Sequence, residues 1–118
     1  MEAKNIGELF GIRTQSHYLH LLTTSFAEHK ALGGFYPEWL TLTDSLIEIY
    51  FGKYGRVDGS FMNFIQGSSV SCEDMLNAAL LNVLAIETDT RKEDSDILNI
   101  LADMKQLINH TRYLLTLK

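Results

Sequence analysis

Two histidines and two carboxylates in the first half of the chain are the residues best suited to metal chemistry. Asp44 and Glu48 follow His17 and His29, and the four residues fall at offsets of 0, 12, 27 and 31. The two carboxylates are one helical turn apart, so on a helix they lie on one face. Imidazole nitrogens and carboxylate oxygens together suit iron, manganese or zinc. The spacing therefore predicts a metal site, provided that helices hold these side chains.

The first element that must position them is a helix from Asn5 to about Leu22. One set of side chains recurs every three or four positions and includes Ile6, Leu9 and His17. A second apolar set lies roughly opposite, at about 100° per residue, and comprises Ile12, Leu19, Leu22 and Phe26. A helix exposed on one side carries a single apolar stripe, so two stripes predict two packing partners. One is the chain's own bundle and the other is a neighbouring subunit.

A turn is predicted at residues 23–25, followed by a second helix that runs toward Tyr54. Ser25 and Glu28 form a capping box, in which the serine oxygen and the glutamate each satisfy one free N–H at the helix start.

Pro37 is expected to disturb this second helix. It removes an N–H and crowds the carbonyl of Gly33, which predicts a kink or a short break at residues 33–36. An alternative is one continuous helix over residues 5–32, with the next helix beginning at Pro37.

Two further helices follow a long connection over residues 56–71, which has room for one or two helical turns. Ser71 with Asp74 predicts the start of a third helix that ends near Glu87. Thr90 with Glu93 predicts a capping box for a fourth, whose apolar stripe runs from Ile97 to Leu115. The chain is therefore predicted to be one all-α domain, residues 1–118. Its architecture is a ferritin-like four-helix bundle with one long crossover connection between helices two and three.

The last two predicted helices offer no ligands to a site inside this bundle. Di-iron bundles place a Glu-x-x-His motif on two of their helices, and this sequence has none. On the fourth helix, Asp96, Asp103 and His110 fall on a polar stripe that faces away from the apolar one. All four candidate ligands come from the first two helices, as a site shared between two subunits requires.

Composition excludes several classes of protein. The formal charge is −5 with a pI of about 5.2, and the ten basic residues are spread along the chain, which argues against nucleic-acid binding. The single cysteine, Cys72, cannot form an internal disulfide, and the N-terminus lacks the features of a signal peptide. No apolar run approaches the roughly 20 residues of a membrane span. We therefore expect a cytoplasmic protein that does not enter a membrane.

The spacing of His17, His29, Asp44 and Glu48 resembles that of the metal ligands in the Dps family, the bacterial mini-ferritins. His17-Tyr18 resembles that family's His-Trp, and the stretch from Asp44 to Glu48 resembles its Asp-x-x-x-Glu. Residues 57–71 resemble its small linking helix, and residues 110–115 the close of its last helix. The resemblance implies a homodimer or larger homo-oligomer, iron bound at the dimer interface and ferroxidase activity.

The sequence also departs from the Dps pattern. The family commonly has an acid where this chain has Gly33 and an arginine where it has Ile49, and many members carry a basic tail that is missing here. A fainter resemblance connects residues 13–17, 25–32 and 52–55 to small proteins of tailed bacteriophages, which would place the chain in a host cytoplasm or a virion.

Several of these residues also have purely structural interpretations. Asp44 and Glu48 would serve as a solvated helix face or hold Arg13 in an ion pair, and His20 would be a neighbour of the site rather than a ligand. Two function classes therefore stay open. The first is a ferritin-like metal protein with ferroxidase-like chemistry, and the second is a non-enzymatic helical accessory or structural protein of a bacteriophage.

Overall fold

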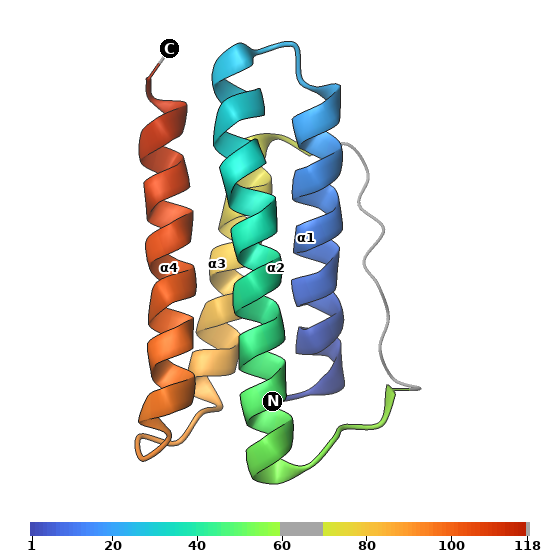
Figure 1. Ribbon diagram of the computed structural model, residues 1–118, viewed down its shortest axis with the longest axis vertical. Coiled ribbons are helices and arrows are strands. Elements are labelled where there is room, and N and C mark those ends of the chain that lie inside the picture. Colours follow the sequence, from blue (N-terminus) through green and yellow to red (C-terminus); the bar gives the residue numbers. More distant parts are fainter. Residues whose placement is uncertain (60–69, 118) are drawn as a thin grey trace.

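The computed structural model describes residues 1–59 and 70–117, whose regular elements are four α-helices. These are α1 (Ala3–Leu22), α2 (Phe26–Tyr54), α3 (Cys72–Thr88) and α4 (Ser95–Leu115). α1 and α4 run in one direction along the bundle, and α2 and α3 run in the other (Figure 1). α2 ends at the opposite end of the bundle from the start of α3 (Figure 1). The predicted all-α arrangement of four helices is confirmed.

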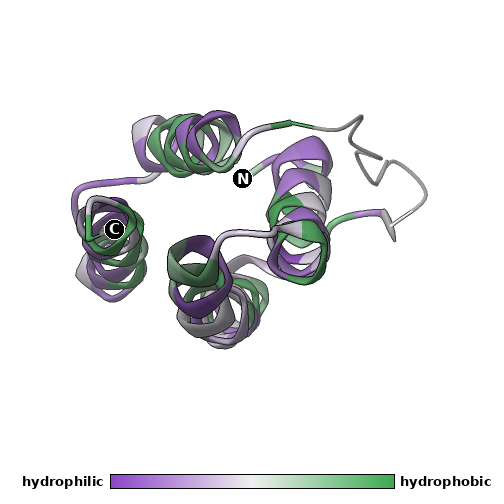
Figure 2. Cartoon of the chain, turned by 90° about the horizontal axis from the view of Figure 1, so that it is seen from above, coloured by the Kyte–Doolittle hydropathy of each residue, from purple (hydrophilic) through white to green (hydrophobic). Residues whose placement is uncertain are grey.

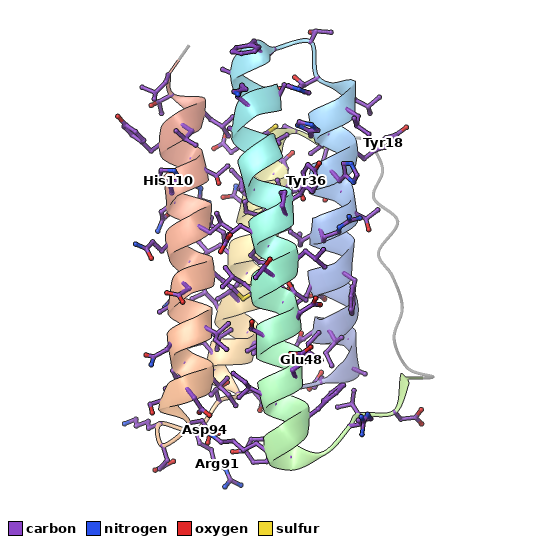
Figure 3. The ribbon with its side chains drawn as sticks, in the orientation of Figure 1. Tyr18, Tyr36, Glu48, Arg91, Asp94 and His110 are labelled. Atoms are coloured by element: carbon purple, nitrogen blue, oxygen red, sulfur yellow. The ribbon has the colours of Figure 1, made fainter. Side chains whose placement is uncertain are left out.

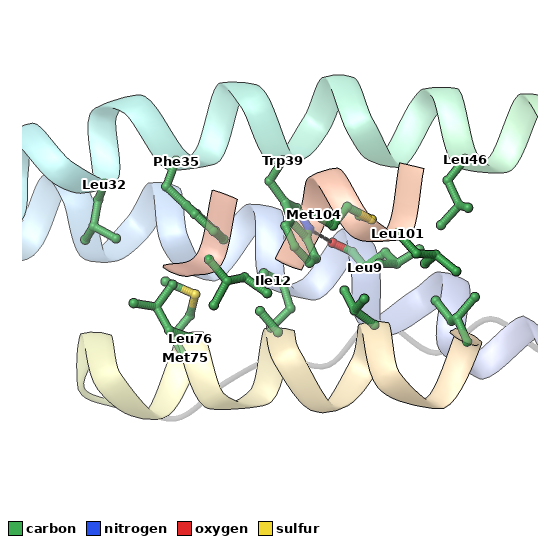
Figure 4. Close-up of a cluster of buried hydrophobic side chains, with 14 of the residues drawn as sticks. Leu9, Ile12, Leu32, Phe35, Trp39, Leu46, Met75, Leu76, Leu101 and Met104 are labelled. Atoms are coloured by element: carbon green, nitrogen blue, oxygen red, sulfur yellow. Dashed lines mark hydrogen bonds between the residues drawn. The ribbon is translucent and has the colours of Figure 1, made fainter. Parts of the chain in front are cut away.

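Each helix packs against two neighbours around a shared interior. α1 lies against α2 and α3, and α4 lies against the same two helices. Figure 2, seen from above, shows the four helices around a common centre. Side chains from all four helices meet there, and Figure 4 shows part of this cluster. Trp39 is its largest fully buried member, and its indole Nε1–H donates to the Leu9 carbonyl at 3.0 Å. This bond ties α2 to α1 through the core.

The predicted turn between the first two helices is confirmed, and the alternative of one continuous helix over residues 5–32 is wrong. The Ser25 hydroxyl oxygen accepts the Glu28 backbone N–H at 3.3 Å, as the capping box requires. The glutamate half of the box differs, because the Glu28 carboxylate accepts the Thr23 hydroxyl at 2.5 Å instead of a backbone N–H.

Of the kink or short break predicted at residues 33–36, the break is wrong, because α2 is helical through Pro37. Phe35 and Trp39 flank the proline and are both fully buried. Burying such side chains contributes roughly 1.5–3 kcal/mol each, which is comparable to the roughly 3 kcal/mol that a proline costs inside a helix. Tertiary packing therefore holds the helix through a residue that disfavours it.

At α3 the predicted start is confirmed, because the Ser71 hydroxyl oxygen accepts the Asp74 N–H at 3.0 Å. The predicted capping box at Thr90 is wrong. The Thr90 hydroxyl donates to the Ile86 carbonyl at 2.6 Å, and α4 begins at Ser95 with Asp94 as its N-cap. The predicted linking helix at residues 57–71 falls mostly on residues 60–69, which lie outside the described part of the chain. No helix among the described residues combines the length and apolarity needed to cross a bilayer.

Candidate metal site

Three imidazoles and a tyrosine lie together where α1 ends and α2 begins. The His17 ring stacks on Tyr36, with centroids 4.2 Å apart and planes 13° apart. The His20 ring stacks on His29, with centroids 3.9 Å apart and planes 16° apart. His20 also lies 5.3 Å from Tyr36. We call His17, His20, His29 and Tyr36 the histidine patch.

Two reciprocal hydrogen bonds hold His20 against His29. The His20 Nδ1 lies 2.7 Å from the His29 carbonyl oxygen, and the His29 Nδ1 lies 2.9 Å from the His20 carbonyl oxygen. A carbonyl oxygen only accepts, so each Nδ1 carries a proton and donates. In the neutral rings the lone pair is then on Nε2, the nitrogen that remains for a metal. His20 belongs to the last turn of α1, where backbone carbonyls lack helical partners, so the His29 ring also caps that helix.

Gly33 lies directly beside the His20 ring. A Cβ at position 33 would lie 3.0 Å from the His20 Cε1, whereas a Cβ at Gly34 would meet nothing within 4 Å. The ring therefore occupies the space that a side chain at position 33 would need.

The two predicted carboxylates lie on α2, far from the histidine patch. Asp44 is 15 residues beyond His29 (44 − 29), which is about 22 Å along a helix at 1.5 Å per residue. Both Asp44 and Glu48 are exposed, and Figure 3 shows Glu48 well below Tyr36 on the same helix. Among the described residues, no three His, Cys, Asp or Glu side chains are grouped to hold an ion. One chain thus carries both halves of the predicted ligand set without joining them.

Charge differs between these two positions on the α1–α2 face. The Arg13 guanidinium lies over the Tyr36 ring, 5.9 Å from its centroid, and Lys30 is exposed beside His29. In the part of the chain that the structure describes, no ion pair joins Arg13 to Asp44 or Glu48, so that alternative is wrong. The patch end of the face is basic and the Asp44–Glu48 end is acidic.

Apolar side chains at the same end of the bundle remain exposed. Tyr18, Leu21, Leu22 and Phe26 are 61%, 65%, 56% and 76% exposed. Ile6, Leu9 and Ile12 of α1 are buried in the core. Ile12, predicted on the second apolar side, is therefore buried together with Ile6 and Leu9 of the first, so the predicted division into two opposite sides is wrong. The apolar side chains that face outward are those near the C-terminal end of the helix.

A second polar cluster lies at the opposite end of the bundle, where Figure 3 labels Arg91 and Asp94. The Lys53 Nζ is 3.1 Å from Asp94 and 2.5 Å from Asp96. Asp94 also accepts a short hydrogen bond from the Tyr54 hydroxyl. This bond and the nearby Lys53 hold the pKa of Asp94 below its usual value. The cluster joins the end of α2 to the start of α4.

Cys72, at the start of α3, is a buried free thiol. Burial and the nearby Glu28 carboxylate together raise the pKa of this thiol to about 11. The thiol is therefore protonated at neutral pH in the metal-free protein.

The sequence predicted His17 and His29 as ligands and placed His20, which lies at the centre of the patch, beside the site. His20 contacts His29, Tyr36 and the position of Gly33. The three-residue spacing of His17 and His20 on α1 was the available signal, since it places both rings on one face.

Residues 20–115 match the family of unknown function DUF5856, and the chain belongs to that family. No curated protein and no solved structure matches the chain.

Proposed function

We propose that this DUF5856 member is a ferritin-like metal-binding protein whose site forms between two copies of the chain. His17 and His29 of one copy face Asp44 and Glu48 of the other, and together they bind iron, manganese or zinc. One observation carries the proposal. The imidazoles and carboxylates lie on the same α1–α2 face, but His29 is about 22 Å from Asp44 along α2, and Tyr36, on which His17 stacks, is about 12 Å from it, too far to share an ion within one chain.

A two-fold pairing of this face would solve the separation. In such a pairing each patch meets the complementary patch of the other copy, so one contact is made twice. Two antiparallel α2 helices would place the basic patch end of one copy on the acidic Asp44–Glu48 end of the other. Opposite charges favour this register and disfavour the parallel one. The exposed Tyr18, Leu21 and Phe26 would add apolar area to the interface.

Helix order supports the ferritin-like classification. α1 with α2 and α3 with α4 form antiparallel pairs, and one long connection links the pairs (Figure 1). Ferritin-like bundles have this connectivity and build metal sites from facing helices. Ferroxidase-like activity belongs to the proposal only if iron is the ion that binds.

Native mass spectrometry with elemental analysis tests the proposal. The wild-type protein should form dimers or larger oligomers that retain metal, while His17→Ala and Asp44→Ala should lose metal at unchanged oligomer mass. His110→Ala is the matched control, because His110 is an exposed imidazole on α4 outside the patch. A wild-type protein that is monomeric and metal-free after loading with Fe²⁺, Mn²⁺ or Zn²⁺ would contradict the proposal.

A second candidate is a non-enzymatic helical accessory or structural protein of a bacteriophage. The stacked rings and reciprocal bonds of His20 and His29 favour it, because they also fasten the α1–α2 turn without any metal. On this account the oligomer forms without metal, and the histidine variants lower thermal stability only.

A further inference from the structure

We infer that the imidazole half of this site is the pair His17 and His20, positioned by His29, and that it prefers Zn²⁺ to Fe²⁺. The inference rests on the proposed two-copy site. It changes one of that site's ligands and names its metal.

The two α1 imidazoles are slightly farther apart than a shared ion needs. His17 and His20 are three residues apart on one helix, with ring centroids 6.4 Å apart and planes inclined by 44°. With Zn–N bonds of about 2.0–2.1 Å, two imidazoles on one tetrahedral ion have centroids about 5 Å apart. Small side-chain rotations cover that difference.

His20 and His29 cannot share an ion while they are stacked. An ion bound to an imidazole nitrogen lies near the plane of that ring, and these two planes are within 16° of parallel at a centroid distance of 3.9 Å. A single ion cannot lie in both planes. The stack therefore separates the roles of the two rings, so that one binds metal and the other supports it.

The hydrogen bonds are compatible with residue 29 in the supporting role, but because they are reciprocal they do not by themselves choose between the two rings. Metal-binding histidines commonly donate their second ring N–H to a backbone carbonyl, which fixes the tautomer and the ring orientation. The His29 carbonyl accepts from the His20 Nδ1 in this way at 2.7 Å. The His29 ring, stacked on His20, restricts the remaining rotation.

Helix electrostatics favour the same assignment. His20 is in the last turn of α1, where the helix macrodipole is negative and stabilises a cation. His29 is near the start of α2, where the macrodipole is positive. A cation is therefore better placed on the α1 side of the patch.

The preference for zinc follows from the donor set. Two imidazole nitrogens come from His17 and His20, and two carboxylates come from Asp44 and Glu48 of the other copy. For a given set of nitrogen and oxygen donors, Zn²⁺ binds more tightly than Fe²⁺ in the general order of affinities for divalent metals. The His20 ring fills the space beside Gly33, so the chain itself adds no further carboxylate from that position.

Calorimetric titration of the full-length protein with ZnCl₂ tests the ligand assignment. Phenylalanine keeps a ring in the stack but has no donor nitrogen, so His20→Phe should weaken Zn²⁺ binding by more than about 100-fold, and His29→Phe by about 10–100-fold at most. His110→Phe on α4 should have no effect. If His20→Phe does not fold, His20→Gln replaces it, and circular dichroism checks each variant.

Titration with Co²⁺ provides a spectroscopic readout that a purely structural role would not change. Its visible absorption should show tetrahedral coordination in the wild-type protein and in His29→Phe, and should be lost in His20→Phe. Fe²⁺, titrated without oxygen, should bind more weakly than Zn²⁺.

Distinct outcomes would overturn the inference and the proposed function. If His29→Phe abolishes Zn²⁺ binding while His20→Phe retains it, the ligand assignment is wrong but the two-copy site stands. Fe²⁺ binding as tight as Zn²⁺ binding would overturn the metal preference alone. If the wild-type protein binds none of Fe²⁺, Mn²⁺ and Zn²⁺, both the inference and the proposed function fail.

Discussion

Each end of the bundle holds a polar cluster, but only at the Asp94 end do the charged groups pair with one another. At the Asp94 end, Lys53 lies between the carboxylates of Asp94 and Asp96, and the Tyr54 hydroxyl donates to Asp94. At the histidine patch, the Nδ1–H groups of His20 and His29 both donate to backbone carbonyls, and the Nε2 atoms of these rings take no part in the two bonds.

This difference separates a structural role from a binding role. Charges that neutralise each other fasten helix ends and need nothing more. A cluster of nitrogen donors with Arg13 and Lys30 beside it needs negative charge from outside. In the proposed pairing, Asp44 and Glu48 of a second copy would supply such charge. We therefore propose that the Asp94 end maintains the fold and that the patch end binds the metal.

The largest expected effect on stability lies in the core between the two ends. Trp39→Ala removes a fully buried indole and the hydrogen bond to the Leu9 carbonyl, and should cost about 3–5 kcal/mol of unfolding free energy. Urea denaturation measures this, with Tyr113→Ala, at a residue that is 60% exposed, as a control expected to change by less than about 0.5 kcal/mol. An equally small change in unfolding free energy for Trp39→Ala would mean that the indole does not anchor α2 to α1.

Acidification should act mainly on the Asp94 end. The Tyr54 hydrogen bond lowers the pKa of Asp94, and the Lys53 hydrogen bond lowers the pKa of Asp96. A carboxylate whose folded-state pKa is depressed stabilises the protein above the unfolded value of about 3.9, and this contribution is lost as pH falls through the folded pKa.

Thermal melting between pH 7 and pH 2 should therefore show a decrease in Tm that is smaller in Asp94→Asn, which already lacks the carboxylate. At pH 7 the same variant should have a lower Tm than the wild-type protein and unchanged metal affinity. Asp103→Asn, on the exposed side of α4, is the control. Identical acid profiles for Asp94→Asn and the wild-type protein would contradict the role given to this cluster.

Adjacent glycines in α2 should give the smallest and most local contrast. Gly34→Ala meets open space and should stabilise the helix by about 0.5–1 kcal/mol. Gly33→Ala adds the same methyl group 3.0 Å from the His20 Cε1, so the displaced ring should offset that gain and weaken Zn²⁺ binding. Chemical denaturation and zinc titration of both variants measure the difference. If the two variants behave alike, the His20 ring is not held in place.

Much of the fold could be predicted from the sequence, because short-range patterns determine it. Apolar periodicity predicted all four helices, and the serine caps at Ser25 and Ser71 located two of their starts. The break near Pro37 was wrong because local propensity does not include the burial of Phe35 and Trp39. The start of α4 was wrong because Thr90 bonds back to Ile86 while Asp94, held by Lys53 and Tyr54 from α2, becomes the N-cap.

The candidate site was less predictable, because it depends on contacts between α1 and α2. Spacing along the chain selected His17 and His29 but did not reveal that the His20 ring stacks on His29 and fills the space beside Gly33. Gly33 first looked like a position from which a ligand is missing. In the structure the His20 ring fills the space that a side chain at this position would need.

In the proposed site one copy supplies the imidazoles and the other supplies the carboxylates, and mixing two complementary variants distinguishes this arrangement from a site within one chain. One chain carries His17→Ala and His20→Phe, and the other carries Asp44→Asn and Glu48→Gln. Each should bind no zinc alone. After random exchange, mixed dimers regain one intact site, so the mixture should bind about one quarter of the wild-type zinc. A mixture that exchanges subunits but binds no more zinc than its separate components would contradict the claim.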